Sequence, residues 1–233
     1  MDKYTKDMDH SYSLGMSLTI EALLHKPDKV REVVLSAKAN KNSQLDLLID
    51  LCDRNHIPYR YDENVIRKLS VKENCYCIGV FEKSESPVKT LRHVLLYGFN
   101  DFGELGTILR SAVAFDFEDI ILINSDIDIF DPRCIRASMG SVFHIGLGRY
   151  ASLEEYEKAF AGFHIYPFVS NSNSQLEEVE FKEPYGLLIS QDPHGLDSFA
   201  DGICLMKDCK KEISLSIRSS IILEAAYDQK RSR

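Results

Sequence analysis

Apolar positions along the chain follow two spacings, one typical of helices and the other of strands. Leu14, Leu18, Ala22 and Leu23 recur on one face of a helix, and residues 45–52 repeat that spacing. Short β-branched or wholly apolar runs separate such segments, and each run is predicted to be a strand. This alternation predicts an α/β fold with a largely parallel sheet.

The predicted elements fall into two sets on either side of a polar stretch. Strands are predicted over 31–36, 58–62, 75–83, 93–98, 119–124, 142–147, 163–170, 185–190 and 203–207. Helices are predicted over 14–26, 45–52, 103–115, 131–140, 152–161 and 213–229, with one more that begins after a capping Asp62. Residues 84–90 are polar around one proline and are predicted to link two α/β domains.

Composition narrows the class of protein. The chain has 233 residues, of which 44% are hydrophobic and 27% charged, so it can bury a core and is not disordered as a whole. No apolar run approaches the roughly 20 residues that span a bilayer. The polar start MDKYTKDMDH lacks the apolar core of a secretory signal, and a cytoplasmic protein without a membrane partner is expected.

Cysteine spacing gives no sign of a metal site. The six cysteines are Cys52, Cys75, Cys77, Cys134, Cys204 and Cys209. None forms a C-x-x-C pair, so no metal is expected and the thiols are expected to be free. Cys75 and Cys77 are predicted to share one face of a strand.

The net charge of −8 argues against a nonspecific coat for nucleic acid, which needs a basic field. Residues 1–89 hold 14 basic and 14 acidic side chains, whereas residues 90–233 hold 14 basic and 22 acidic ones. Binding of RNA would therefore depend on a local patch.

General nucleotide-binding and hydrolase motifs are absent from the sequence. It contains no P-loop, no G-x-G-x-x-G after a strand, no G-x-S-x-G and no H-E-x-x-H. Gly98, Gly103 and Gly106 surround a strand-to-helix turn, where backbone N–H groups could meet a carboxylate or phosphate. That signal alone names no function.

Separated segments carry a more specific signal. They are DFGELGTILRSAVAFDFEDIILI (101–123), RASMGSVFHIGL (136–147), YGLLISQDPHGLD (185–197) and ISLSIRSSIILEAA (213–226). In this order and spacing they resemble the SpoU-type (TrmH-like) RNA ribose methyltransferases of the SPOUT superfamily. The earlier segments 14–36, 57–70 and 75–81 resemble the L30e-like substrate-binding domain often fused ahead of that catalytic domain.

The resemblance implies an architecture and an activity. Residues 11–83 would form a small L30e-like α/β domain that binds RNA, and residues 91–229 a SPOUT α/β-knot domain with a deep trefoil knot. Family members bind S-adenosyl-L-methionine in the knot, methylate a ribose 2′-hydroxyl of tRNA or rRNA, and form a homodimer through the C-terminal domain.

The resemblance also assigns catalytic positions. An Asn and an Arg six positions later act near the ribose in this family, and Glu104 and Arg110 occupy those places here. Arg110 is expected to contact the ribose or its phosphate, and Glu104 to hold its guanidinium by a charge-assisted hydrogen bond. A helix arginine that merely pairs with a neighbouring carboxylate is the structural alternative. Ser216 replaces a second family Asn and is the third catalytic candidate.

Further positions follow from the family's cofactor loops. The expected cofactor-binding residues are Ser190, Gln191, Asp192, Gly195, Leu196, Met206, Ser214 and Leu215. Ser190 stands for a family Gly, Asp192 for a Glu, and Pro193 removes a backbone donor. The charged run 207–212 is either a solvated loop or part of a remodelled pocket.

Arg110, Arg136 and Ser138 are the candidate RNA contacts, with structural packing as the alternative for Arg136 and Ser138. His144, on a predicted alternating strand, is expected to be a core histidine. Because polar signature positions are substituted, two other functions stay open: a catalytically silent RNA-binding or assembly factor, and a methyltransferase acting on another acceptor. Binding of S-adenosylmethionine would separate the silent factor from both enzymes.

Overall fold

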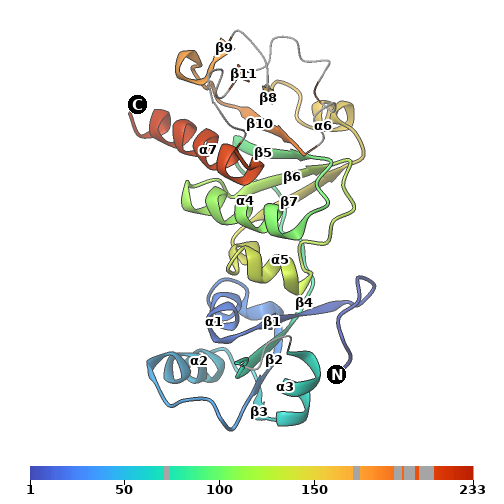
Figure 1. Ribbon diagram of the computed structural model, residues 1–233, viewed down its shortest axis with the longest axis vertical. Coiled ribbons are helices and arrows are strands. Elements are labelled where there is room, and N and C mark those ends of the chain that lie inside the picture. The colour runs from blue at the N-terminus through green and yellow to red at the C-terminus, as the bar shows by residue number, and fades with distance from the viewer. Residues whose placement is uncertain (71–73, 170–173, 192–195, 197–202, 205–212, 233) are drawn as a thin grey trace. The chain divides into compact units, whose positions relative to one another are not determined.

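The computed structural model describes residues 1–70, 74–169, 174–191, 196, 203–204 and 213–232 (Figure 1). The chain forms two compact units. The N-terminal unit contains Met1–Ser84 and Asp128–His144, and the C-terminal unit contains Glu85–Ile127 and Ile145–Arg233. The segment 128–144 thus leaves the C-terminal unit and packs with the N-terminal one. The RNA-binding role expected for residues 11–83 stays a prediction.

A four-stranded mixed sheet forms the centre of the N-terminal unit. Its elements are β1 (His10–Leu14), α1 (Met16–His25), a 3-10 turn (Pro27–Lys29), β2 (Val30–Leu35), α2 (Ser43–Arg54), β3 (Tyr59–Tyr61), α3 (Glu63–Leu69), β4 (Cys77–Glu82), α5 (Pro132–Ala137) and a second 3-10 turn (Ser141–Phe143). The strand order is β1-β4-β2-β3, in which β4 runs antiparallel to both neighbours and β3 runs parallel to β2.

Side-chain caps fix where α2, α3 and α5 of this unit begin. The predicted cap at Asp62 is confirmed, because its carboxylate accepts the N–H groups of Asn64 and Val65. Asn42 caps α2 in the same way, and Asp131 caps α5 just before Pro132. The starts of α2, α3 and α5 are therefore encoded locally, whereas α1 begins after Gly15 without a side-chain cap.

The C-terminal unit contains a seven-stranded sheet. Its elements are β5 (Arg92–Tyr97), α4 (Phe102–Ala114), β6 (Asp119–Ile123), β7 (Gly146–Tyr150), α6 (Leu153–Ala159), β8 (His164–Val169), β9 (Ser174–Gln175), a 3-10 turn (Leu176–Glu178), β10 (Tyr185–Ser190), β11 (Ile203–Cys204) and α7 (Leu215–Arg231). The strand order is β7-β6-β5-β10-β8-β11-β9, and the paired strands are parallel. The predicted α/β class is confirmed.

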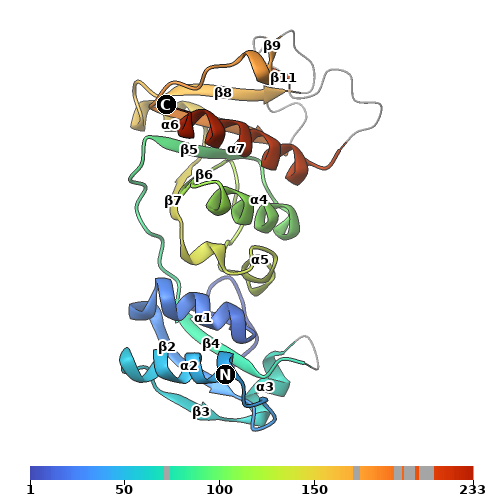
Figure 2. The same ribbon diagram turned by 90° about the vertical axis from the view of Figure 1, so that its left-hand side faces the viewer.

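Helices cover both faces of this parallel sheet, with α4 and α7 side by side on one face (Figure 2). Ser111 of α4 and Ser220 of α7 share a hydrogen bond of 2.8 Å between their hydroxyls. On the other face Tyr156 of α6 is fully buried against Leu95 and Leu188. The central strands β5, β6 and β10 are consequently buried on both faces and mostly apolar, as buried parallel strands are.

The structure corrects three local predictions. The strand predicted over 142–147 is wrong: Gly140 adopts φ 87°, residues 141–143 form a 3-10 turn, and β7 starts only at Gly146. A Cβ on Gly146 would lie 2.7 Å from the Pro87 carbonyl oxygen, so only glycine fits where β7 begins beside the Pro87 backbone. The strand β1 was missed because residues 10–14 precede a stronger helical pattern. Cys75 is buried but precedes β4.

Three further expectations concern the cysteines, membrane-spanning segments and the trefoil knot. Cys52, Cys75, Cys77 and Cys134 are free thiols, as expected. No helix in the described part of the chain is long and apolar enough to cross a membrane. The trefoil knot stays a prediction, and residues 192–195, 197–202 and 205–212 lie outside the described residues.

Candidate cofactor and active site

The order of strands in the parallel sheet reverses at β5. The chain proceeds from β5 to β6 and β7 on one side, whereas β10 and β8 lie on the other. Tyr97 and Ser190 are paired in register at the carboxyl ends of β5 and β10. In open parallel sheets, ligands bind outside the carboxyl ends of the strands where the order reverses. The turns after β5 and β10 are therefore the place to look for a site.

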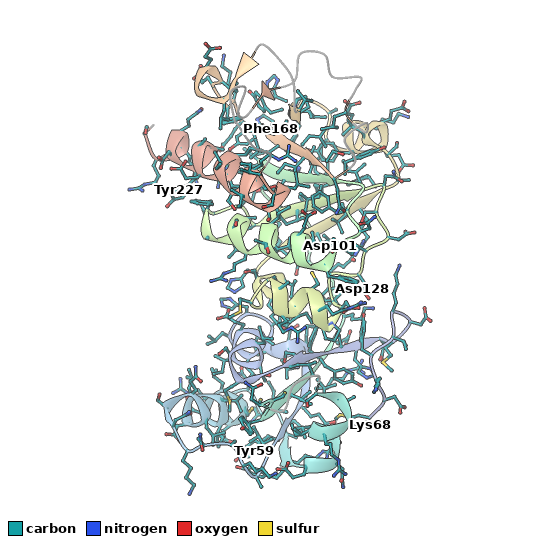
Figure 3. All side chains as sticks on the ribbon, viewed as in Figure 1. Tyr59, Lys68, Asp101, Asp128, Phe168 and Tyr227 are labelled. Atoms are coloured by element: carbon teal, nitrogen blue, oxygen red, sulfur yellow. The ribbon has the colours of Figure 1, made fainter. Side chains whose placement is uncertain are left out.

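A well-defined turn leads from β5 into α4. Gly98 adopts φ 70° there, and its N–H donates to the carbonyl of Ile123 at the end of β6. Asp101, labelled in Figure 3 at the start of α4, accepts the N–H of Glu104 at 2.7 Å. This cap places Glu104 in the first turn of the helix, at the carboxyl edge of the sheet.

Gln191 ties the turn after β10 to the turn after β5. Its backbone N–H donates to the Tyr97 carbonyl at 3.1 Å, continuing the ladder between the strands. Its side-chain Oε1 accepts the N–H of Asn100 at 2.8 Å, and its Nε2 donates to Glu104 Oε2 at 3.0 Å. The structure thus brings together Ser190, Gln191 and Glu104, three of the residues predicted from the sequence.

Arg110 lies further along α4 and is exposed. It forms no hydrogen bond or ion pair with any residue that the structure describes, so the expected bond to Glu104 is not formed. The reason is helical geometry. Six positions correspond to about 9 Å along the axis and about 120° around it, whereas helix ion pairs form at spacings of three or four. The guanidinium is instead available to a ligand.

The other predicted site residues of the C-terminal unit lie on or just before α7, in the apolar cluster around Tyr156, or outside the described residues. Ser214 caps α7 by accepting the Ile217 N–H, and its hydroxyl lies 3.2 Å from that of Ser216. Leu215 follows as the first residue of the helix. Leu196 is buried in the apolar cluster around Tyr156. Asp192, Gly195 and Met206 lie outside the described residues, as do Pro193 and the charged run 207–212.

Arg136 and Ser138 belong to the N-terminal unit. Arg136 is exposed, and no described residue pairs with it. Ser138 is fully buried, and its hydroxyl donates to the Ile135 carbonyl at 3.1 Å within its own turn. This bond is a packing contact, so of the two residues Arg136 is the better candidate for an RNA contact.

The expectation for His144 is corrected. It follows a 3-10 turn instead of lying on a strand, is partly exposed, and bonds Glu21 Oε2 from Nε2 at 2.8 Å. Among the histidines that the structure describes, the fully buried one is His93 on β5, between the Tyr156 hydroxyl and the Thr90 carbonyl. Asn100 and Asp101 were not predicted as site residues, although an Asp after a strand and before a helical pattern is a recognisable cap signal.

Part of the chain is similar to a known protein family. Residues 92–205, which contain the strand reversal, match the family model of the SpoU rRNA methylases. This region of the chain is a SpoU methylase domain.

Several members of the family and several solved structures are similar to this chain. The 23S rRNA (guanosine(2553)-2'-O)-methyltransferase RlmP of Bacillus subtilis is 26% identical over 183 residues, covering 77% of this chain and 71% of RlmP. The 23S rRNA (adenosine(1067)-2'-O)-methyltransferase of Streptomyces azureus is 34% identical over 107 residues, covering 42% of this chain and 40% of that enzyme.

The fold matches those of SpoU-type structures over nearly the whole chain. The SpoU methyltransferase AviRb from Streptomyces viridochromogenes, solved in complex with AdoMet, superposes with a TM-score of 0.77 at 19% identity and covers 96% of this chain and 91% of its own. An rRNA methyltransferase from Sinorhizobium meliloti gives a TM-score of 0.74 at 24% identity, covering 94% and 87%. The expected α/β architecture of a SpoU-type methyltransferase is therefore confirmed.

Proposed function

We propose that this chain is an RNA methyltransferase that transfers a methyl group from S-adenosyl-L-methionine to a ribose 2′-hydroxyl of tRNA or rRNA. The supporting observation is the pair of side-chain hydrogen bonds that Gln191 makes with Asn100 and Glu104 at the strand reversal, here called the Gln191 clamp. It lies within the region that matches the SpoU family. It holds the turns after β5 and β10 in one arrangement, and a transfer reaction needs donor and acceptor aligned.

The expected cofactor-binding residues fit a nucleoside cofactor in their chemistry. Ser190, Gln191 and Ser214 offer hydroxyl and amide groups of the kind that bind ribose and adenine edges. Leu196 is apolar and buried in the cluster that contains Tyr156. S-adenosylmethionine supplies a methyl group on a positively charged sulfur, so a nearby acidic edge at Glu104 suits it.

The acceptor side of the reaction is assigned to Arg110. Methyl transfer to the ribose 2′-oxygen would form an O–C bond and break the S–C bond, with release of S-adenosylhomocysteine and passage of the hydroxyl proton to solvent. A planar guanidinium can hold the ribose oxygen and the adjoining phosphate in the attacking geometry. Its lack of any described partner leaves all its donors for this task. Glu104 then acts through Gln191 as a positioning residue, and Ser216 is a further polar group of the site.

The test of this function is methyl transfer. Wild-type protein, labelled S-adenosylmethionine and total RNA from a strain lacking the protein should yield labelled RNA, with 2′-O-methylnucleosides after digestion. Label in another nucleoside position would favour a methyltransferase with a different acceptor. Protein that binds RNA but neither S-adenosylmethionine nor its demethylated product at millimolar concentration would be the silent RNA-binding factor.

We also propose a homodimer formed through the C-terminal unit, and RNA contacts from the N-terminal unit that include Arg136. The first rests on the family resemblance of residues 91–229. The second rests on the exposed guanidinium of Arg136, which has no described partner. Because the net charge of −8 gives RNA no general attraction, such local basic groups are needed for RNA to bind.

A further inference from the structure

A second cluster of chemically capable side chains lies in the N-terminal unit, away from the turns after β5 and β10. Glu21 and His25 are four residues apart on α1 and therefore share a face of that helix. His144, just after the 3-10 turn 141–143, reaches the same face from the segment 128–144. The three residues come from two stretches of chain separated by more than a hundred positions.

Their distances match a set of metal ligands. His144 Nε2 lies 2.8 Å and His25 Nε2 3.6 Å from the same oxygen, Glu21 Oε2, and one ligand atom from each residue lies within 4.8 Å of the others. Ligands held about 2.0–2.1 Å from a tetrahedral Zn²⁺ lie about 3.4 Å apart. The two observed separations fall on either side of that value, so small side-chain movements would complete the site.

An ordinary hydrogen-bonding role explains less of this geometry. One histidine would satisfy the Glu21 carboxylate, yet two imidazole rings lie with their centroids only 3.7 Å apart beside it. Gly140 also allows the approach, because a Cβ there would lie 2.9 Å from Glu21 Cβ.

We propose that Glu21, His25 and His144 form a three-ligand site for a divalent transition metal of the Zn²⁺ class. Two imidazoles and a carboxylate suit Zn²⁺ and its neighbours, whereas Mg²⁺ and Ca²⁺ prefer oxygen alone. The side chains are 34%, 39% and 25% exposed, so an ion can enter and water can take the fourth position. A bound ion would fasten α1 to the segment 128–144 within the N-terminal unit, independently of methyl transfer.

The sequence contains only part of this signal. An E-x-x-x-H spacing on a helix places two ligands on one face, but it is common without a metal. The third ligand depends on how the segment 128–144 folds back onto α1, which no local pattern reveals. This is why no metal site was expected from cysteine spacing and the known zinc motifs.

The experiment uses the full chain, stripped of metal by a chelator. Calorimetry with Zn²⁺ is expected to show one ion per chain, and Co²⁺ as a probe should give the intense visible bands of a low-symmetry site. His25→Gln and His144→Gln should each weaken Zn²⁺ binding at least about tenfold, since even outer-shell changes cost that much. Zn²⁺ should also raise the melting temperature of the wild type, and less so that of the variants.

The matched control is His56→Asn. His56 is an exposed histidine of the same unit at φ 55°, a conformation that Asn tolerates, and it lies outside the cluster. It should bind Zn²⁺ like the wild type. The proposal is overturned if wild type binds no Zn²⁺ below about 100 μM (roughly 5.5 kcal/mol), or if folded His25→Gln and His144→Gln bind as tightly as the control. A melting scan of each metal-free variant establishes that it is folded.

Discussion

Gln191 donates from Nε2 to Glu104 Oε2 at 3.0 Å, and this bond joins the end of β10 to the first turn of α4. The other end of the same amide accepts the Asn100 N–H at 2.8 Å. A carboxylate only accepts and a backbone N–H only donates, so the two neighbours fix which way the amide points. The clamp therefore depends on the amide itself and not merely on a side chain of that size.

Gln191→Glu tests the clamp with almost no change in shape. The new carboxylate would face Glu104, replacing a hydrogen bond by repulsion between like charges. We expect the affinity for S-adenosylmethionine to fall at least about tenfold, or about 1.4 kcal/mol, as measured by calorimetry. The double variant Gln191→Glu with Glu104→Gln restores one donor between the two side chains and should recover most of the loss. Equal affinity of the single variant and wild type would show that the clamp does not shape the cofactor site.

Arg110 is the residue on which the proposed chemistry depends most. Arg110→Ala and Arg110→Lys should both reduce methyl transfer at least roughly a hundredfold, a barrier increase near 2.7 kcal/mol, because lysine keeps the charge but loses the planar fork. Since Arg110 is exposed and has no described partner, folding and cofactor affinity should change little. Arg231→Ala, at an exposed helix arginine of the same unit, is the control. An Arg110→Ala enzyme as fast as wild type would remove the assigned role.

The buried His93 should make stability depend on pH. Burial lowers its pKa, although Asp119 and the Thr90 carbonyl oppose the shift. The unfolded chain, with an ordinary histidine pKa of about 6.5, then binds the proton more readily than the folded one. The contribution of His93 is thus fully present above about pH 6.5 and is lost as pH falls towards the folded pKa, by at most about 1.4 kcal/mol per pH unit.

The measurement is urea unfolding between pH 5 and 7. His93→Gln should be less stable than wild type but should show a smaller dependence of the unfolding free energy on pH. His164→Gln, at an exposed position of the same unit, should keep the wild-type slope. An unchanged slope in His93→Gln would mean that other groups control the acid sensitivity.

Asp116 balances a buried cation. Arg92, whose side chain is only 9% exposed, donates from Nη2 to the Asp116 carbonyl at 2.8 Å and to its carboxylate at 3.1 Å. Asp116→Asn keeps a residue that tolerates φ 62° but removes the charge, and should cost about 1–3 kcal/mol of unfolding free energy. Lys230→Gln removes the exposed partner of the same carboxylate and should cost less than about 1 kcal/mol. Equal losses in the two variants would contradict this ranking.

The proposed homodimer can be tested on the intact chain. Light scattering at tens of micromolar should give twice the mass of the 26.6 kDa chain. A clean monomer at that concentration would contradict the proposal.

The sequence alone determined the buried strands and the helix caps, because these depend on residues that are neighbours in the chain. The apolar runs at 119–124 and 185–190 became central strands, and Asp62 capped a helix, because such signals act over a few neighbouring residues. The family resemblance added Glu104 and Gln191 as site residues, but not the bond between them, which joins positions 87 apart in the chain.

Only the tertiary structure decided the contacts between distant segments. It placed the segment 128–144 in the N-terminal unit, brought His144 to Glu21 across 123 positions, and left Arg110 without the partner expected for it. It also replaced the first part of the strand predicted over 142–147 by a 3-10 turn, which follows Gly140 at φ 87°. The physical reason is that the pattern of apolar positions in the sequence indicates which side of each segment is buried. The neighbours of a polar side chain depend instead on which segments the folded core brings together.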